Sequence, residues 1–285
     1  MSSPKVWLIT GASSGFGRSM TELVLKKGDI AFATARDPST LADLSASYPP
    51  TQLITFPLDV TSSSAVTAAF AKAREAFGRI DVVFNNAGRN LVGEIEAVPE
   101  EMARELMELN FWGAVAVSRE AIKFFREVNP AGAGGTLLQM SSVATSYCPA
   151  ASGYYCASKW ALEGFSESLS REMDPRWNIK ILILEPAMFK TKIFQNSPKV
   201  PSHPAYTDPA NAAMQTRGVA ESAHTGKGAA SVDDANEVVY KLVTGEVKSE
   251  QLRVPIGAKA FWLAKMKLDT LKATVEEYEK LSVGM

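Results

Sequence analysis

Few residues of this sequence are suited to covalent cross-links or to metal binding. The 285 residues include two cysteines, Cys148 and Cys156, and two histidines, His203 and His224. Two cysteines so close in the sequence give no disulfide framework, which agrees with a reducing compartment and predicts a cytoplasmic protein. Neither histidine has a second ligand at a suitable spacing, so we expect no metal site.

The sequence also lacks an excess of charge of one sign and a long apolar run. Its 30 basic and 31 acidic residues give a net charge of −1, which excludes strong attraction to nucleic acid or to an anionic membrane. No segment is apolar over the length of a membrane span. The N-terminus shows no basic region followed by an apolar stretch, so no signal peptide is expected.

What the sequence does have is a regular alternation of short apolar runs with longer helical patterns. The runs are rich in β-branched and aromatic residues, as strands are when both faces of a sheet are covered. They are Val6–Ile9, Ile30–Ala35, Leu53–Phe56, Val82–Phe84, Thr136–Met140, Ile179–Leu184 and Leu252–Ile256. This alternation predicts an α/β fold: a doubly wound, Rossmann-like parallel sheet of about seven strands with helices on both faces.

Helical spacing fills most segments between these runs, for example Ala65–Phe77 and Glu100–Val128. With 46% apolar residues and no linker that divides it, the chain is expected to form one domain over residues 1–285. The stretch Gln195–Gly228, rich in Pro, Ala, Thr and Ser, interrupts the alternation and predicts a substrate lid at about residues 188–230.

The end of the sequence predicts a helix at about residues 258–281. Apolar residues recur there at three–four spacing, which is usual for a packed helix face. They are Phe261, Ala264, Leu268, Leu271, Val275 and Tyr278.

A glycine-rich segment follows the first predicted strand at once and opens a helical pattern. It reads Thr10-Gly11-Ala12-Ser13-Ser14-Gly15-Phe16-Gly17. Glycines allow a tight turn and a close approach to a pyrophosphate, and the N-terminus of a helix points free N–H groups at phosphates. The alternative is a turn that binds nothing, but the position after the first strand favours a dinucleotide site.

Tyr155 and Lys159 are four residues apart and share one face of a predicted helix. An ammonium group beside a tyrosine lowers the pKa of the phenol from about 10. Such a tyrosine can exchange a proton with a carbonyl or an alcohol. Taken alone, the pair is better explained as part of an ordinary helix, because such pairs are common.

In combination, these segments resemble the short-chain dehydrogenase/reductase family in its short-subunit form. The resemblance runs from Lys5 to about Gly257, with T-G-x-x-x-G-x-G, N-N-A-G and Y-x-x-x-K in the family's order and spacing. Asn110, Ser142 and Thr191 stand at the family's expected positions. Ala187 replaces the glycine that usually follows Pro186, so the backbone there is expected to differ slightly from the family's.

The resemblance implies a nicotinamide cofactor and a catalytic role for four residues. Tyr155 would be the general acid in reduction and the base in oxidation, and Lys159 would depress its pKa and hold the nicotinamide ribose. Ser142 would stabilise the substrate oxygen, and Asn110 would hold a water in a proton relay to Lys159. The residues expected to contact the cofactor are Gly11, Ser13, Ser14, Gly15, Phe16, Gly17, Arg36, Asp59, Val60, Asn86, Ala87, Gly88, Tyr155, Lys159, Pro186 and Thr191.

Three of these assignments have structural alternatives. Asn110 could cap or kink its helix. Ser141 is as good a candidate as Ser142 if the spacing to the tyrosine is ignored. Asp59, expected to accept a hydrogen bond from the adenine amino group, could simply precede a helix capped by its neighbours.

The end of the second strand predicts NADP(H) as the cofactor. An acid at this point binds the ribose 2′-hydroxyl of NAD, whereas a nearby arginine accommodates the 2′-phosphate of NADP. Here Ala35 takes the acidic position and Arg36 follows it, and Arg36 can hold a phosphate through two charge-assisted hydrogen bonds. In the alternative, Arg36 is a surface charge paired with Asp37.

We therefore expect an NADP(H)-dependent oxidoreductase that interconverts a carbonyl compound and an alcohol, with a cytosolic NADP(H) pool favouring reduction. The lid region and the loops facing the tyrosine are largely apolar and Arg217 stands alone, which favours an apolar substrate of medium size. These apolar residues could instead pack the lid or fill an oligomer interface. The family often forms dimers or tetramers, so a homo-oligomer is expected.

Two rival functions have weaker support. A non-catalytic dinucleotide-binding sensor or scaffold would usually have lost a catalytic residue, but all four are present. An epimerase or dehydratase of the family's longer relatives would have a larger substrate domain and a different glycine loop.

Overall fold

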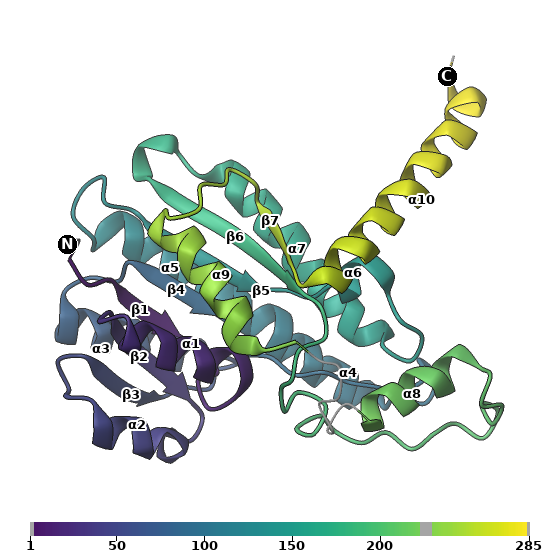
Figure 1. Ribbon diagram of the computed structural model, residues 1–285, viewed down its shortest axis with the longest axis horizontal. Coiled ribbons are helices and arrows are strands. Elements are labelled where there is room, and N and C mark those ends of the chain that lie inside the picture. Colours follow the sequence, from purple (N-terminus) through teal and green to yellow (C-terminus); the bar gives the residue numbers. More distant parts are fainter. Residues whose placement is uncertain (1–2, 223–229, 284–285) are drawn as a thin grey trace.

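A seven-stranded sheet forms the centre of the molecule (Figure 1). The structure, a computed structural model, describes residues 3–222 and 230–283. Its strands pair in the order β3-β2-β1-β4-β5-β6-β7, and every pairing is parallel. The predicted fold class is therefore confirmed. His224 and the predicted lid residues 223–229 lie outside the described residues.

All seven predicted strands are present, with small differences at their ends. The strands are β1 (Val6–Ile9), β2 (Ile30–Ala35), β3 (Leu53–Pro57), β4 (Val82–Asn85), β5 (Gly135–Met140), β6 (Ile179–Pro186) and β7 (Arg253–Ile256). The helices in the described residues are α1 (Gly15–Lys26), η1 (Pro38–Leu41), α2 (Ala42–Ser47), α3 (Ser63–Phe77), α4 (Glu100–Met107), η2 (Glu108–Gly113), α5 (Ala114–Glu127), α6 (Ala144–Tyr147), α7 (Gly153–Glu172), η3 (Pro175–Trp177), α8 (Ala212–Ser222), α9 (Val232–Thr244) and α10 (Ala258–Ser282).

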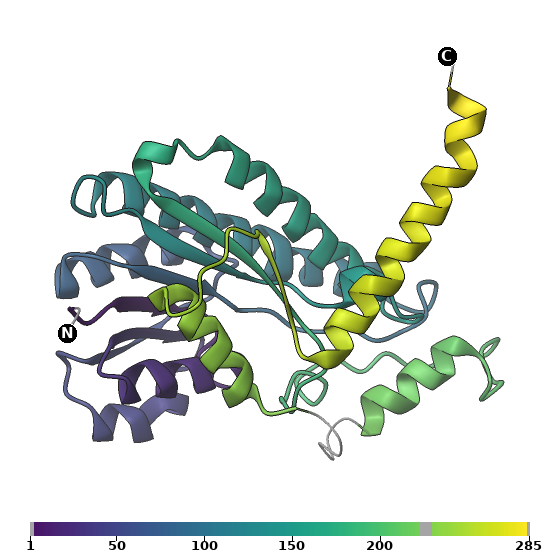
Figure 2. The same ribbon diagram turned by 45° about the horizontal axis from the view of Figure 1, so that its top comes forward.

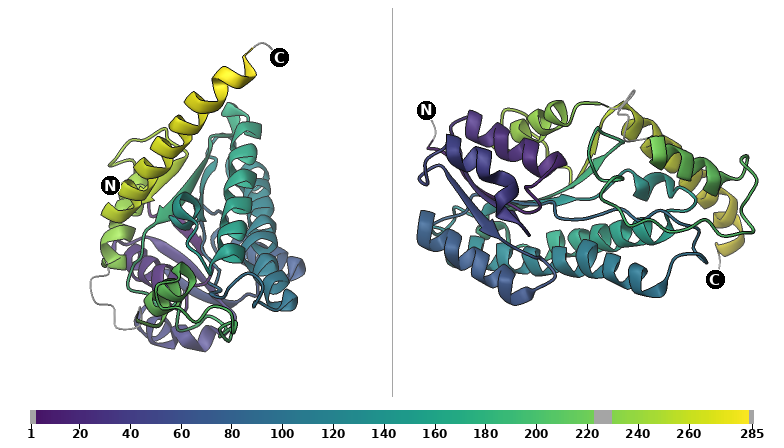
Figure 3. Two further views of the ribbon diagram at one scale, coloured as in Figure 1. Left: turned by 90° about the vertical axis from the view of Figure 1, so that its right-hand side faces the viewer. Right: turned by 90° about the horizontal axis from the view of Figure 1, so that it is seen from below.

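Helices cover both faces of the sheet, so the core has two halves. Figure 3 shows α1, α2 and α9 on one face and α3, α5 and α7 on the other. Successive residues of β1 point to opposite sides: Trp7 and Ile9 join the core beneath α1 and α9, while Leu8 joins the core beneath α3 and α5. Because both faces are buried, the strands needed apolar residues at every position, which is why they were visible in the sequence.

The order of the strands places a crevice at the middle of the sheet. The chain moves from β1 outward to β2 and β3, then returns to the other side of β1 with β4. Ligands of open α/β sheets bind outside the carboxyl ends of the strands at such a switch point. The segments after Ile9 and Asn85 both emerge here, because Ile9 is in register with Phe84.

The predicted helix Glu100–Val128 is broken into three parts, which corrects the sequence prediction. A π-helical segment, η2, separates α4 from α5. Gly113 ends this segment close to α3's N-terminal loop, since a Cβ there would lie 2.8 Å from Cγ2 of Val60. Such π segments are frequent at functional sites, and this one contains Asn110.

The lid and the C-terminal helix also depart from the predictions. The lid region was expected to be irregular but contains α8. The stripe of α10 was expected to pack, yet the helix projects from the body (Figures 1 and 2), leaving Leu268 64% and Val275 61% exposed. Only its first turns contact the body, where Ala260 and Leu263 are buried, because the rest extends past the end of the sheet. No helix in residues 3–222 and 230–283 has the length and apolarity of a membrane span.

Candidate active site

The glycine segment makes a tight turn from β1 into α1. Gly11 and Gly15 adopt positive φ angles of 66° and 54°, which glycine tolerates without strain. A Cβ on Gly17 would lie 2.3 Å from the carbonyl oxygen of Gly11. No side chain caps α1, and Ser14 at its N-cap is extended. The turn could therefore hold a phosphate group, because no side chain caps its first N–H groups.

The loop after β4 is fastened to this turn by short polar side chains. Thr10 Oγ1 accepts hydrogen bonds from the N–H groups of Asn86 and Ala87, at 2.9 and 3.0 Å. Asn86 returns a hydrogen bond from Nδ2 to the carbonyl oxygen of Thr10 at 2.9 Å. Two of the predicted cofactor segments are thus held as one unit.

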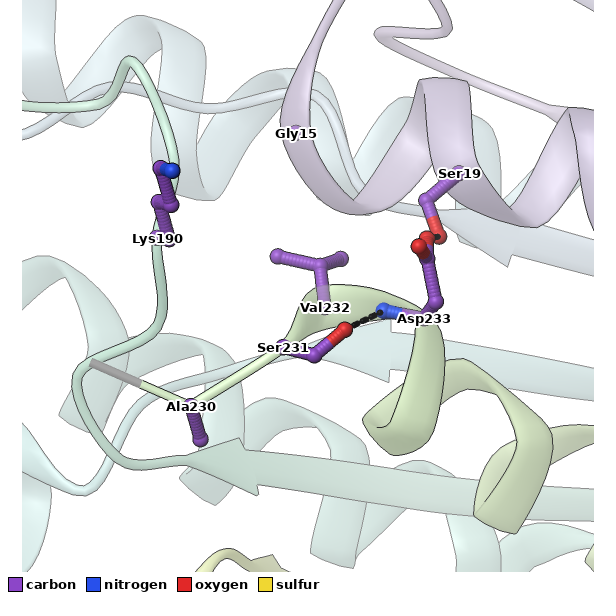
Figure 4. A pocket seen from close by; sticks show the side chains of 7 residues that line it. All are labelled: Gly15, Ser19, Lys190, Ala230, Ser231, Val232 and Asp233. Carbon is purple, nitrogen blue, oxygen red and sulfur yellow. Dashed lines mark hydrogen bonds between the residues drawn. The ribbon is translucent and has the colours of Figure 1, made fainter. Parts of the chain in front are cut away.

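A cavity of about 380 Å³ opens beside this turn (Figure 4). It is lined by Gly15, Ser19, Lys190, Ala230, Ser231, Val232 and Asp233. Ser19 donates a 2.6 Å hydrogen bond to Asp233, so the N-terminal ends of α1 and α9 are joined at its wall. Thr191, next to Lys190, lies 3.4 Å from the position of a Cβ on Gly15. The cavity therefore borders the predicted phosphate end of the site.

At the end of β2, Arg36 is exposed and free to meet a phosphate. Asp37 does not pair with it in the described structure. Instead, Asp37 caps η1 by accepting a hydrogen bond from the N–H of Ser39 at 3.0 Å. Asp59 has a lowered pKa, chiefly because the N–H of Thr61 donates to its carboxylate, and the charge of Arg36 lowers it further. Ser62, not Asp59, caps α3.

Tyr155 and Ser142 meet where β5 and α7 come together. Tyr155 is buried, and burial raises its pKa to about 12 despite a hydrogen bond with Ser142 that lowers it. The expected lowering of this pKa by Lys159 is not found, because Lys159 points its Nζ at the carbonyl oxygen of Met140, 2.7 Å away. That Nζ lies 5.8 Å from the centre of the Tyr155 ring.

The two neighbouring serines have different surroundings. Ser141 is buried and donates a 2.6 Å hydrogen bond to the carboxylate of Glu163. Ser142 is half-buried, interacts with Tyr155 and accepts a hydrogen bond from the N–H of Ala144 at 3.1 Å. This geometry favours Ser142 over Ser141 as the substrate-binding hydroxyl, independently of the sequence spacing.

Both polar atoms of the Asn110 side chain bind protein groups. Its Oδ1 accepts from the N–H of Arg89 at 2.9 Å, and its Nδ2 donates to the carbonyl oxygen of Arg89 and to Ser158 Oγ. The side chain thus joins η2 to the chain after Gly88 and to α7. Asn110 Oδ1 and Lys159 Nζ lie 3.1 and 3.6 Å from the position of a Cβ on Gly88, so a larger residue there would crowd Asn110. The predicted water relay stays a prediction.

The replacement of the usual glycine by Ala187 costs no backbone strain. Ala187 is not among the residues with positive φ, and its N–H donates to the carbonyl oxygen of Ile256 at 2.9 Å. Any residue can adopt this conformation. Pro186 ends β6 in pairing with Ile256, so the nicotinamide-end segment begins from a well-ordered strand.

The sequence prediction missed two acidic residues, Glu94 and Glu163. Arg217, expected to stand alone, forms a bidentate ion pair with the buried Glu94 at 2.7 and 2.5 Å. No local pattern could reveal this pair, because 123 residues separate the partners. Glu163 lies one helical turn after Lys159, and an acid inside a predicted core helix was the available signal. In the described residues no cluster suitable for a metal is found.

The fold and this site define a class: an oxidoreductase that uses a nicotinamide dinucleotide. The profile of the short chain dehydrogenase family matches residues 5–201. The chain is 37% identical over 288 residues to the oxidoreductase calM of Penicillium decumbens, covering 99% of this chain and 93% of that protein. These matches and the motifs establish that the chain belongs to the short-chain dehydrogenase/reductase family.

Solved structures agree with this assignment. A short-chain dehydrogenase from Streptomyces avermitilis superposes with a TM-score of 0.86 at 33% identity, covering 100% of this chain and 99% of that one. A member from Burkholderia phymatum in complex with NAD has a TM-score of 0.72 at 25% identity, covering 85% of this chain and 86% of that one. The family acts on small molecules, and its members bind NAD or NADP.

Proposed function

We propose that this oxidoreductase is an NADP(H)-dependent carbonyl reductase in which Tyr155 is the general acid and base. The observation that carries the proposal is the meeting of Tyr155, Ser142 and Lys159 beside the loop that contains Gly88. When bound, the cofactor supplies or accepts the hydride. Ser142 donates to the substrate oxygen and stabilises the charge that develops there.

Tyr155 gives its proton to that oxygen during reduction. A pKa of about 12 keeps the phenol protonated at neutral pH, which is the form that a general acid requires. Lys159, held by the carbonyl group of Met140, would orient the nicotinamide ribose. Asn110 would hold the relay water predicted from the family resemblance.

The cofactor residues of the proposal are those predicted from the sequence. The turn Gly11–Gly17 and the loop Asn86–Gly88 would hold the pyrophosphate and ribose, and Asp59 with Val60 the adenine. Pro186 and Thr191 would face the nicotinamide end. The exposed guanidinium of Arg36, unpaired with Asp37, supports binding of a 2′-phosphate and hence NADP(H) over NAD(H).

The surroundings of Tyr155 support an apolar carbonyl or alcohol as the substrate. Tyr155 belongs to a buried cluster with Leu91, Ala144, Cys156 and Val200, the last of these from the lid. Phe189, within the predicted lid region, packs instead against Phe16 in the core at 5.3 Å between ring centres. Higher kcat/KM for sugars or 2-keto acids than for aromatic and alicyclic ketones would contradict the apolar substrate.

We also infer a single catalytic domain with a lid and a cytoplasmic location, as expected from the sequence, and a homo-oligomer, dimer or tetramer, as the family resemblance implies. The exposed apolar stripe of α10 supports self-association. Light scattering coupled to gel filtration tests the oligomer, and a monomer at micromolar concentration would contradict it.

The decisive experiment replaces Tyr155 by phenylalanine. Tyr155→Phe removes one oxygen and keeps the ring, so kcat for NADPH-dependent reduction should fall ~10²–10⁴-fold while the Kd for NADPH stays unchanged. Tyr154→Phe is the matched control, because the Tyr154 hydroxyl is at the surface and only approaches the carbonyl oxygen of Ile95. Retention of activity by Tyr155→Phe would reject the mechanism. If the wild-type protein binds NADPH but turns over no carbonyl substrate, the non-catalytic sensor is favoured instead.

A further inference from the structure

The buried ammonium group of Lys159 needs a counter-charge that the mechanism does not mention. Lys159 is 4% exposed, and its Nζ donates a hydrogen bond to the neutral carbonyl group of Met140. Burial lowers its pKa to about 8, while the charge of Glu163 acts in the opposite direction. A buried ammonium without an opposite charge nearby loses its proton readily.

Glu163 is placed to supply that charge. It follows Lys159 by one turn of α7 and is 2% exposed. One of its carboxylate oxygens accepts the 2.6 Å hydrogen bond of Ser141, and the other accepts from Nε of Arg253 at 3.3 Å. In the sequence, Ser141 lies between Met140, whose carbonyl group binds Lys159, and Ser142. The same carboxylate therefore lies one helical turn from the lysine and fastens the strand end that carries Met140 and Ser142.

The other charged groups around the pair form a compact network. Glu185 of β6 is buried 3.5 Å from Nε of Arg253, and its pKa is raised to about 7 by burial and by the charge of Glu163. Glu167 of α7 also binds Arg253, at 2.9 Å, but its side chain is partly exposed. From η2 comes only the neutral amide of Asn110. Arg89, in the same region, pairs with Glu105 at the surface.

We propose that Glu163 is a positioning residue of the catalytic site: its carboxylate keeps the buried Lys159 protonated and, through Ser141, holds the end of β5 in place. This inference rests on the proposed role of Lys159. Because the lysine would hold the nicotinamide ribose, its protonation governs cofactor binding as well as turnover. The same variants can therefore be tested by both measurements.

The test is the pH dependence of NADPH affinity, measured by fluorescence titration, and of kcat/KM with 4-nitrobenzaldehyde. Removing the negative charge in Glu163→Gln should move the alkaline loss of both quantities to lower pH by about 1 pH unit. Glu167→Gln is the matched control on the same helix and the same arginine, and its alkaline limb should coincide with that of the wild type.

A third variant keeps the proposal testable if Glu163→Gln does not fold. Arg253→Gln removes the cation that shares the charge of Glu163, so Lys159 should hold its proton more tightly and the alkaline limb should move to higher pH. Arg253 is partly exposed, which favours folding. An alkaline limb of Glu163→Gln or Arg253→Gln at the wild-type pH overturns the inference. Failure of the proposed function is distinct: the wild type would bind NADPH and reduce no carbonyl.

Discussion

The two sides of the crevice are held by different kinds of contact. On the cofactor side, Thr10, Gly17 and Asn86 interlock through backbone groups and short side chains, with no room for one more carbon at Gly17. On the lid side, a charged pair between Glu94 and Arg217 joins α8 to the segment after β4. Arg217 also donates to the carbonyl oxygen of Val200 at 2.8 Å.

This difference suits the two tasks. A pyrophosphate site gains affinity from donors that are already in place, so a close-packed and rigid turn is favoured. A substrate site must admit and release its ligand, so polar contacts that can break and form again suit the proposed lid. We therefore expect changes on the cofactor side to alter cofactor binding, and changes on the lid side to alter KM and local opening.

Within this comparison, the largest effect is expected on the cofactor side, from one added methyl group at Gly17. Gly17→Ala forces the turn to shift, because the new Cβ would meet the backbone of Gly11, and should weaken NADPH binding about 10- to 100-fold, as overpacking costs about 1–3 kcal/mol. Gly218→Ala, in α8 with nothing within 4 Å of the new Cβ, should leave NADPH binding and KM unchanged. If the two variants gave equal NADPH titration curves, the expected difference between the cofactor side and the lid side would be contradicted.

A charge reversal at the adenosine end should change cofactor choice without affecting the lid. Arg36→Asp loses a charge-assisted interaction with the 2′-phosphate, worth about 1.5–3 kcal/mol, so the affinity for NADPH should fall about 10- to 100-fold. The affinity for NADH should rise, because the new acid can bind the 2′-hydroxyl. If the wild type already binds both cofactors equally, the assignment of Arg36 is wrong.

On the lid side, breaking the ion pair should raise KM by about tenfold with little change in kcat or in NADPH affinity. Arg217→Met leaves the buried carboxylate of Glu94 without its partner, a cost of about 3–5 kcal/mol that opening of the lid relieves. Limited proteolysis should then cut within residues 188–222 before the body unfolds. The double variant Glu94→Leu with Arg217→Met leaves no unpaired charge and should be cut more slowly than the single variant.

Acid should loosen the same lid through a smaller, graded effect. The guanidinium of Arg217 lowers the pKa of Glu94 from 4.5 to about 2. Because the folded-state pKa is depressed, the pair stabilises the closed lid fully above about pH 4.5, and this stabilisation is lost as the pH falls towards 2. Hydrogen exchange in α8, normalised to intrinsic rates, should accelerate in this range. Glu94→Gln should show no such transition.

The fold and the family were predictable because their determinants are local. Strands buried on both faces need continuous apolar runs, and all seven runs became strands. The glycine turn requires positive φ at Gly11 and Gly15 and a missing side chain at Gly17. These glycines therefore make the turn recognisable in the sequence. The order and spacing of the remaining motifs matched the short-chain dehydrogenase/reductase family, and that resemblance gave their expected roles.

What only the tertiary structure decided depends on contacts between distant segments. The sequence gives no reason for η2, which the approach of Gly113 to Val60 and the hydrogen bonds of Asn110 to Arg89 favour. The pairing of Glu94 with Arg217 and the burial that raises the pKa of Tyr155 need the folded chain. Charge interactions and desolvation are set by distance in space, so neither they nor the projection of α10 could be derived from a one-dimensional pattern.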